Sequence, residues 1–187
     1  MTKECSSYHI NPIVIRELKL QDIPELYKMY RSLSEESKRF FHPFPERVVS
    51  ASSFLTWIPL ALSCIRSLRR ILLRISSSLA YISVCSLYSD KLIGFAFIRF
   101  RSRLYGNLGI VVRDDFQGMG VGSRLMHYLI ILARREGIKR VRLTVLADNY
   151  KAIKLYEKFG FKKTRFIKEG DIYKGKKYDC IEMWLDL

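Results

Sequence analysis

Three glycine residues alternate with other residues in the segment Gln117–Ser123 (QGMGVGS), which lies between an expected strand and an expected helix. The first amide groups of a helix lack intrahelical partners and carry partial positive charge. Glycine also has no Cβ that would keep a phosphate from the backbone. Arg113 and Arg124 flank the segment and would add positive charge. The residue types and their spacing therefore predict a site for a phosphate or another anion.

Four interpretations of this glycine segment compete. The Walker type of phosphate loop requires Gly-Lys-Ser or Gly-Lys-Thr, and the chain contains neither tripeptide. The dinucleotide fingerprint Gly-x-Gly-x-x-Gly fits Gly118 and Gly120 but meets Ser123 at its third glycine. A pyrophosphate loop of the Gln-Gly-x-Gly-x-Gly kind fits every position. A plain turn between a strand and a helix is the remaining, purely structural interpretation.

A second motif, NYKAIKLYEKFGF, occupies residues 149–161. With both motifs the sequence resembles the GNAT superfamily of acyl-CoA N-acyltransferases. The signatures of that family are Gln/Arg-x-x-Gly-x-Gly/Ala and, further along the chain, Asn-x-x-Ala-x-x-Leu-Tyr-Glu-Lys-x-Gly-Phe. The resemblance is strong over residues 91–187 and weaker over 13–50, and no family pattern is recognised over 51–78.

The resemblance implies where acetyl-CoA would bind. Backbone groups of the strand before the glycine segment would bond the pantetheine arm as if it were an added strand. The backbone amides of the glycine segment would hold the pyrophosphate, and an asparagine would contact the cofactor near its reactive arm. The residues assigned in this way are Ile110, Val111, Val112, Gln117, Gly118, Gly120, Val121, Gly122, Ser123 and Asn149.

Acyl transfer to an amine makes three demands on the protein. A lysine-like amine has a pKa near ~10.4 and is mostly protonated at pH 7, so a general base or a water chain must accept a proton. The oxyanion of the tetrahedral intermediate needs a donor, for which the resemblance suggests the N–H of Val112. The leaving thiolate needs a proton, and the hydroxyl of Tyr156 suits that role. A core aromatic on the face of its helix is the alternative interpretation of Tyr156.

The identity of the general base stays open at this point. Glu35 and Glu36 lie in the region that faces the acceptor in the resembled fold, so both are candidate catalytic residues. Other titratable residues near these segments, each more often a surface residue, a loop residue or a helix cap than a base, are Asp114, Asp115, Asp148, His42 and His127.

The hydrophobic periodicity predicts an α/β fold with mixed pairing. Strands are expected over residues 13–18, 78–88, 91–101, 104–112, 141–146, 162–168 and 178–187. Helices are expected over 21–33, 34–41, 54–75 and 149–159, and a further helix begins at the glycine segment and ends at about Glu136. The resemblance implies a mostly antiparallel central sheet, flanked by helices and splayed at the cofactor site. We expect residues 1–12 to be a flexible N-terminal segment and residues 13–187 to form one N-acetyltransferase domain.

The composition is that of a globular protein with a strong positive charge. Lysine and arginine number 33 against 18 acidic residues, which gives a net charge of +15, and 49% of the 187 residues are hydrophobic. The N-terminus lacks the apolar core of a signal peptide, and arginines interrupt the most apolar stretch. The four cysteines lack zinc-ligand spacing. We therefore expect a cytoplasmic protein with reduced cysteines, no metal and no stable membrane insertion.

Together these observations predict an N-acetyltransferase that moves the acetyl group of acetyl-CoA to a primary amine by direct attack in a ternary complex. The acceptor would be a protein N-terminus, a lysine side chain, a small polyamine or an amino sugar. An acyl-CoA-binding sensor domain without turnover is the alternative, followed by a basic protein that binds nucleic acid or a membrane surface. No nucleic-acid partner is expected, because the chain has no recognition motif for one. A homodimer is compatible with the pattern.

Overall fold

The computed structural model describes residues 12–42, 54–75, 80–102 and 104–187, and the predicted flexible segment therefore lies almost entirely outside the described residues. One sheet with the strand order β1-β2-β3-β4-β5-β7-β6 organises the chain. Neighbouring strands are antiparallel except for β4 and β5, which run parallel. The strands are β1 (Val14–Glu17), β2 (Tyr81–Tyr88), β3 (Lys91–Phe100), β4 (Tyr105–Val112), β5 (Arg140–Leu146), β6 (Lys162–Tyr173) and β7 (Lys176–Asp186).

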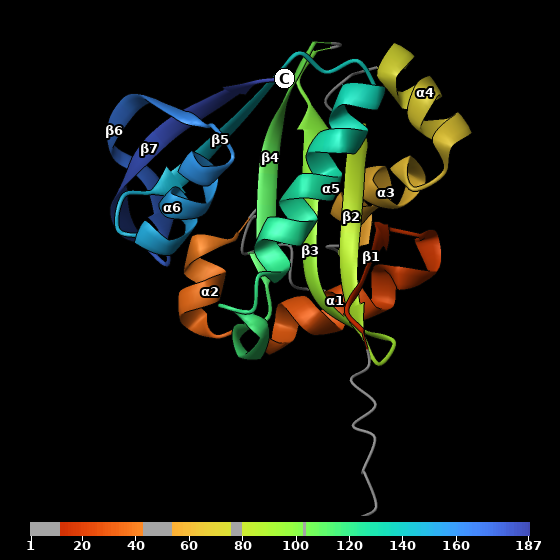
Figure 1. Cartoon of the computed structure of the whole chain (residues 1–187), viewed down its shortest axis with the longest axis horizontal. Helices are drawn as coiled ribbons and strands as arrows, with labels where there is room; N and C mark the ends of the chain where they lie inside the picture. Colours follow the sequence, from red (N-terminus) through yellow and green to blue (C-terminus); the bar gives the residue numbers. More distant parts are fainter. Residues whose placement is uncertain (1–11, 43–53, 76–79, 103) are drawn as a thin grey trace, which may run out of the picture.

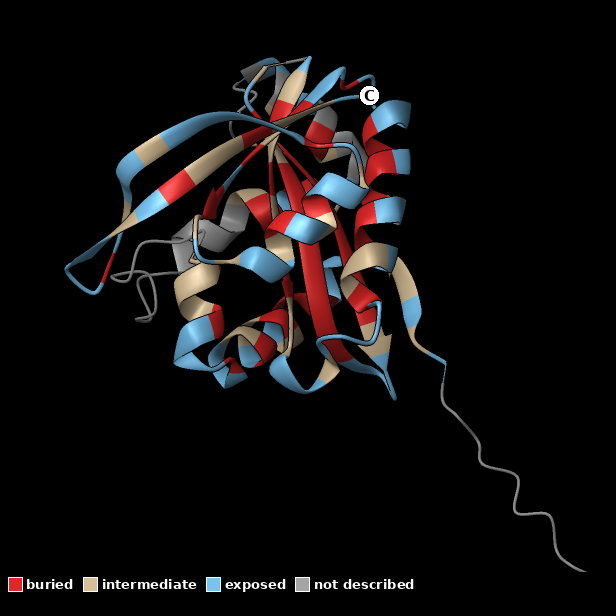
Figure 2. Ribbon diagram, turned by 60° about the vertical axis from the view of Figure 1, so that its left-hand side comes forward, coloured by how far each residue is buried: buried red, intermediate tan, exposed pale blue. Residues whose placement is uncertain are grey.

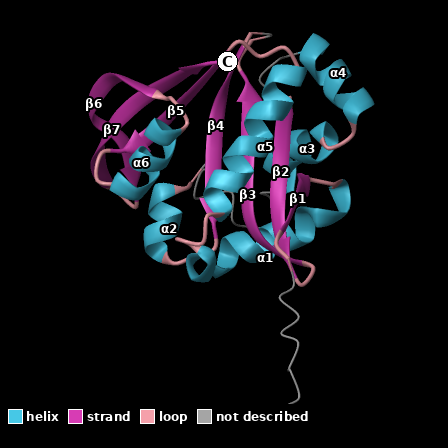
Figure 3. Ribbon diagram, in the orientation of Figure 1, coloured by secondary structure: helices cyan, strands magenta, loops and turns pink. Residues whose placement is uncertain are grey.

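Helices cover both faces of this sheet, which confirms the predicted fold class (Figures 1 and 3). Helices α5 and α6 share a core with one face, and α1 and α3 share a second core with the other. None of the described helices is long and apolar enough to cross a membrane. The helices are α1 (Ile23–Ser32), α2 (Glu35–Phe40), α3 (Phe54–Ser63), α4 (Arg66–Ile75), α5 (Val121–Arg135) and α6 (Tyr150–Lys158).

The central strands β2 and β3 are buried along most of their length (Figure 2). Ile82 and Ile93 pack against α5 on one face, whereas Phe95 packs against α1 on the other. Each large apolar side chain that is fully removed from water contributes roughly 1.5–3 kcal/mol. The two cores therefore fix the sheet between its helices.

The apolar stretch 54–75 was predicted to be one helix, and that prediction is wrong. Tight turns in which the N–H groups of Cys64 and Ile65 bond carbonyls three residues earlier end α3, and α4 starts directly after them. The two helices contact different partners: Ser63 accepts a hydrogen bond from the N–H of Tyr81 in β2, whereas Arg69 of α4 pairs with Glu136 after α5. One straight helix would not meet both partners.

Two hairpins of the sheet, β2–β3 and β6–β7, differ in how much of each was predicted from the sequence. Ser89 and Asp90, which separate the two strands expected over 78–88 and 91–101, both have positive φ, of 48° and 61°, and form a tight turn between β2 and β3. The hairpin of β6 and β7 is longer than predicted, because Lys174 and Gly175 also form a tight turn with positive φ. Irregular pairing between Ile167 and Asp171 interrupts the alternation of side chains along β6. The hydrophobic periodicity therefore did not predict the second half of this hairpin.

Candidate active site

The pairing between β4 and β5 is confined to one end of the two strands. Their parallel ladder ends at Asn107 opposite Arg142. Beyond that point β4 stays paired with β3 as far as Val112, while β5 stays paired with β7 as far as Leu146. The two strands therefore separate, as the resemblance implied, and each presents an unpaired edge to the gap (Figure 1).

A cavity of about 640 Å³ opens at this gap, within the size range of sites for small ligands and cofactors. Strand β4 contributes Ile110, Val111 and Val112 to its wall, and β5 contributes Thr144 and Val145. The three residues of β4 that were predicted to meet the pantetheine arm thus lie at the cavity. An extended chain with amide groups could bond the open edge of β4 as an additional strand would.

The glycine segment forms the mouth of the same cavity. Gly118 and Gly120 have φ values of +78° and +77°, which side chains with a Cβ rarely adopt. Within the described chain, no backbone carbonyl accepts a hydrogen bond from the N–H of Gly118, Gly120, Gly122 or Ser123. Because α5 begins at Val121, these free amides lie at or just before the N-terminus of the helix, where the helix dipole is positive. The segment therefore has the character of an anion site.

Val121 and Gly122 were both predicted to contact the cofactor, but only Gly122 lines the cavity. Val121 has only 1% of its surface exposed and packs in the core beneath the loop, so its side chain anchors the start of α5 and does not line the cavity. Gly122 does line it, and a Cβ there would come within 3.4 Å of Leu155 on α6. Glycine at that position therefore keeps the space between α5 and α6 open.

The side chain of Gln117 bonds protein groups of the cavity wall. Its Nε2 donates to the carbonyl oxygen of Val112 and to the hydroxyl of Ser37, each at 3.1 Å. A longer contact of 3.4 Å joins it to Asp114. Gln117 thus links the end of β4 to α2, a role that its motif position alone does not reveal.

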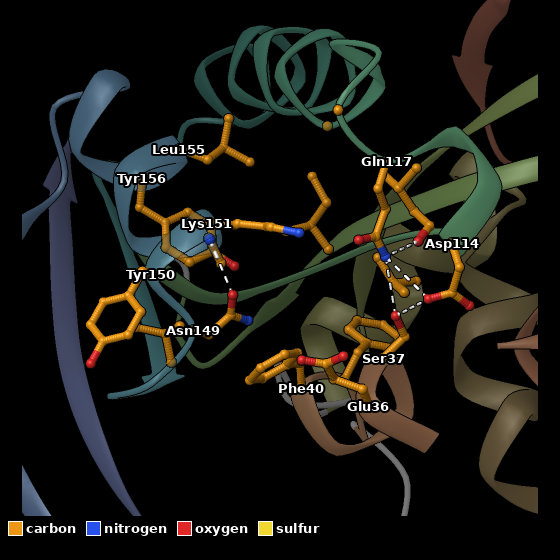
Figure 4. Close-up of a pocket in the computed structure, with 18 of the residues that line it drawn as sticks. Glu36, Ser37, Phe40, Asp114, Gln117, Asn149, Tyr150, Lys151, Leu155 and Tyr156 are labelled. Atoms are coloured by element: carbon orange, nitrogen blue, oxygen red, sulfur yellow. Dashed lines mark hydrogen bonds between the residues drawn. The ribbon is translucent and has the colours of Figure 1, made fainter. Parts of the chain in front are cut away.

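Tyr156 and Asn149 enter the cavity from α6 (Figure 4). Burial raises the pKa of the Tyr156 phenol, because the charged form is poorly solvated there, so the hydroxyl stays protonated at neutral pH and is able to donate. Asn149 uses its Oδ1 as the N-cap of α6, where it accepts a hydrogen bond of 3.1 Å from the N–H of Ala152. Its Nδ2 group is then the part that can donate to a cofactor.

The two candidate bases lie in different surroundings although they are adjacent. Glu36 lines the cavity, and its carboxylate faces the interior beside Phe40 (Figure 4). Glu35 lies outside the lining and bonds Lys174 and the hydroxyl of Tyr173 on the β6–β7 hairpin. The hydrogen bond from Lys174 lowers the pKa of Glu35, which makes it a weaker base.

Sequence reasoning missed several residues of the cavity. Phe40 and Phe41 supply an apolar wall on the side of α2, and Ser37 joins them there. Lys151 is the only lysine or arginine among the described lining residues, and it extends from α6 into the cavity (Figure 4). Lys151 lies two residues after Asn149, which was itself predicted to contact the cofactor at the start of a helix. This closeness in sequence is the signal from which Lys151 could have been predicted.

Comparison with known proteins agrees with this geometry. Residues 28–161 match the model of the acetyltransferase (GNAT) family. The chain belongs to the GNAT family. The matched range includes β4, the glycine segment and the whole of α6, which are the elements that build the cavity of this GNAT chain.

Curated relatives match a short part of this GNAT chain. An uncharacterised N-acetyltransferase of Bacillus subtilis, YobR, is 38% identical over 58 residues, which is 30% of this chain and 24% of that protein. Acetyltransferase Pat of Mycolicibacterium smegmatis is 40% identical over 53 residues, 28% of this chain and 16% of that protein. The matches therefore span about a quarter of these relatives or less.

Solved structures share the fold over nearly the whole chain. The ribosomal-protein-S18-alanine N-acetyltransferase of Escherichia coli is 23% identical, covers 94% of both chains and has a TM-score of 0.67. YncA of Salmonella typhimurium, a putative acetyltransferase solved with its cofactor acetyl-CoA, is 23% identical with a TM-score of 0.72 and also covers 94% of both chains. At these identities the likeness shows the fold of the GNAT chain.

Proposed function

We propose that this GNAT chain is an acetyl-CoA-dependent N-acetyltransferase that acts on a primary amine in a ternary complex. The observation that supports the proposal most is the presence in one cavity of an unpaired strand edge and a glycine segment with free amides. The first suits the amide-containing arm of acetyl-CoA, and the second suits its diphosphate. The acetyl-CoA complex of YncA supports the same cofactor.

The chemistry would run as a direct displacement. The amine nitrogen attacks the thioester carbon, and the N–H of Val112 is the proposed donor to the oxyanion. The carbon–sulfur bond then breaks and the buried hydroxyl of Tyr156 gives its proton to the leaving thiolate. Glu36 takes the proton that the amine releases, either directly or through water, because its carboxylate lies at the cavity and that of Glu35 does not. Solvent finally restores the proton of Tyr156.

The acceptor side suits a cationic nitrogen next to an apolar group. Glu36 supplies the negative charge, and Phe40 and Phe41 supply the apolar wall. Two of the structural neighbours are named as N-acetyltransferases of ribosomal-protein alanine. For this chain a protein N-terminus, a lysine side chain, a polyamine and an amino sugar remain the acceptor classes to compare.

The test has two stages. Calorimetry with CoA measures binding to the cavity, and we expect saturable binding by the wild-type chain. A panel of peptides with free N-termini, lysine peptides, polyamines and amino sugars is then incubated with acetyl-CoA while thiol release is followed. We expect release with one class of amine. CoA binding without release for any amine would instead support a sensor domain, and failure to bind CoA would overturn both functions.

A further inference from the structure

Asp114 joins the loop on the cofactor side to the helix on the acceptor side. It lies two residues after the end of β4 and begins the short 3-10 turn η5 (Asp114–Phe116). Its carboxylate accepts hydrogen bonds from the N–H and the hydroxyl of Ser34, at 2.8 and 2.9 Å, and from the hydroxyl of Ser37 at 2.5 Å. One side chain therefore holds both serines of the first turn of α2, which precede it by 80 and 77 residues.

Gln117 extends this connection to the cofactor groups. Its Nε2 bonds the same hydroxyl of Ser37 and, at the same time, the carbonyl oxygen of Val112 at the edge of β4. A continuous set of hydrogen bonds thus runs from β4 through Gln117 and Ser37 to Asp114 (Figure 4). Any ligand that redirects the side-chain amide of Gln117 or the carbonyl oxygen of Val112 changes the hydrogen bonds that hold α2.

The carboxylate of Asp114 is held by hydroxyl and amide donors. The guanidinium group of its neighbour Arg113 turns away and pairs with Asp115 at 2.7 and 2.8 Å. Burial disfavours the charged form of Asp114, but the hydrogen bonds from Ser37 and Ser34 outweigh this effect, so its pKa lies below the usual value. Such charge-assisted hydrogen bonds are strongly directional, and they fix the orientation of α2.

The orientation of α2 sets the position of the acceptor wall, which is the side of the cavity formed by Glu36, Phe40 and Phe41. Glu36 is next to Ser37 in the sequence, and Phe40 and Phe41 follow one turn later, and all of them line the cavity. A displacement of about 1 Å in such a wall is enough to disturb the alignment of an attacking nitrogen with a thioester.

We propose that Asp114 is a positioning residue that couples the placement of α2 to the occupancy of the cofactor loop. The coupling rests on the proposed function, because the loop must bind CoA. CoA at the loop redirects the Gln117 amide, Ser37 and Asp114 transmit the change, and the acceptor wall becomes ordered before the amine binds. Because such coupling is reciprocal, an α2 that is uncoupled from the loop neither responds to the cofactor nor influences its binding.

Hydrogen exchange of α2 with CoA as the probe tests the coupling. The amides of Lys38 and Phe41 report on α2, since they bond the carbonyl oxygens of Ser34 and Ser37 at 2.9 Å. In the wild-type chain we expect saturating CoA to slow their exchange by at least ~5-fold, at the lower end of typical couplings between sites. Asp114→Asn replaces one acceptor oxygen with an NH₂ group that faces donors, and we expect it to abolish most of this slowing.

The control is the adjacent carboxylate. Asp115 pairs with Arg113 on its own segment, so Asp115→Asn should behave as the wild type. Ser37→Ala removes the middle of this set of hydrogen bonds, while the Asp114 carboxylate keeps its two bonds from Ser34. It should repeat the loss if Asp114→Asn fails to fold. With an amine found by the panel, Asp114→Asn and Ser37→Ala should each raise the KM for the amine by about 10-fold and leave the Kd for CoA within about 3-fold of the wild-type value.

The outcomes separate the coupling from the proposed function. If CoA slows exchange of α2 equally in the wild type and in Asp114→Asn, or does not slow it in a wild type that binds CoA, the coupling is overturned and the function stands. If the wild type does not bind CoA, the function fails and the coupling fails with it. Slowing that is present in the wild type and Asp115→Asn but lost in Asp114→Asn supports the coupling.

Discussion

The two walls of the cavity are built from different kinds of interaction. The cofactor wall consists of backbone groups: the open edge of β4, the amides of the glycine segment and the start of α5, all resting on a buried core. The acceptor wall is α2, a helix of six residues that is held by side chains. Besides Asp114, these contacts include Arg39 with Asp148 at 2.6 Å and His42 with Asp171 at 3.0 Å.

Under the proposed function, this difference would let the scaffold keep its cofactor while its acceptor changes. Backbone groups bind the same way whatever side chains surround them, so the cofactor wall tolerates substitution except where a glycine conformation is required. Ion pairs and hydrogen bonds between side chains can be exchanged one at a time. Each of the following experiments perturbs one wall and measures whether the other responds.

The largest effect is expected from a charge placed in the cofactor wall. Gly120→Glu puts a carboxylate at the anion site and should lower CoA affinity by about 10³-fold, as measured by calorimetry. Gly137→Glu is the matched control. Gly137 has a φ of +80°, close to the +77° of Gly120, and an added Cβ would meet no atom within 4 Å at either position. Gly137 lies at the other end of α5, away from the glycine segment. Both should cost stability alike, by about 1–2 kcal/mol. Equal CoA affinity in the two variants would contradict the assignment of the loop.

Tyr156→Phe removes the proposed proton donor and leaves the cofactor wall intact. We expect kcat to fall about 10²-fold while the Kd for CoA is unchanged, because the hydroxyl acts on the leaving thiolate. Thiol release and calorimetry measure the two quantities. Tyr128→Phe on α5 is the control, because this tyrosine packs against the core and does not line the cavity. A wild-type kcat for Tyr156→Phe would remove Tyr156 from the mechanism and leave it as a core aromatic.

Substitution of the adjacent glutamates tests which face of α2 carries the chemistry. Glu36→Gln should lower kcat/KM by about 10-fold and shift its dependence on pH, since a base is lost from the cavity. Glu35→Gln should have a smaller effect on kcat/KM and no effect on the pH profile, because it removes a contact with Lys174 on the hairpin. The reverse order of the two effects would contradict the assignment of Glu36 as the base.

The smallest expected effect is on the pH dependence of the free energy of unfolding, through the pair of His42 and Asp171. The hydrogen bond to Asp171 raises the pKa of His42, so the pair stabilises the fold at acidic pH, and this contribution is lost as pH rises through the raised pKa. We expect a loss of less than about 1 kcal/mol between about pH 5.5 and about pH 8.5 in the wild type. Denaturation at both pH values should show no such loss for His42→Gln, whereas His127→Gln, on an exposed position of α5, should retain it.

The cofactor wall could be predicted from the sequence because its signals are local. A glycine in the left-handed region, a helix start and an alternating strand each depend on a few consecutive residues. The periodicity therefore placed β4 within one residue of its observed bounds and the end of α5 within one residue of Arg135. Val121 shows the limit of the motif, because a motif position does not say whether a side chain faces the ligand or the core.

The acceptor wall could not be predicted in the same way. Glu35 and Glu36 are equivalent in the sequence, and the packing of α2 on the sheet decides which of them faces the cavity. That packing depends on Phe41, whose ring meets Phe97 edge to face at 6.2 Å beside Gly109 of β4. These contacts join residues that are dozens of positions apart, and no local pattern records them.

The glycine segment, the asparagine–tyrosine motif and the alternation of the strands were enough to predict the mixed α/β fold and to propose an anion site at the start of α5. The tertiary structure decided how far β4 and β5 separate, where the apolar stretch 54–75 breaks, and that Asp114 and Gln117 hold α2. The physical reason is the range of the forces involved. Backbone conformation follows from near neighbours in the chain, whereas a side-chain hydrogen bond exists only after folding has brought its two partners together.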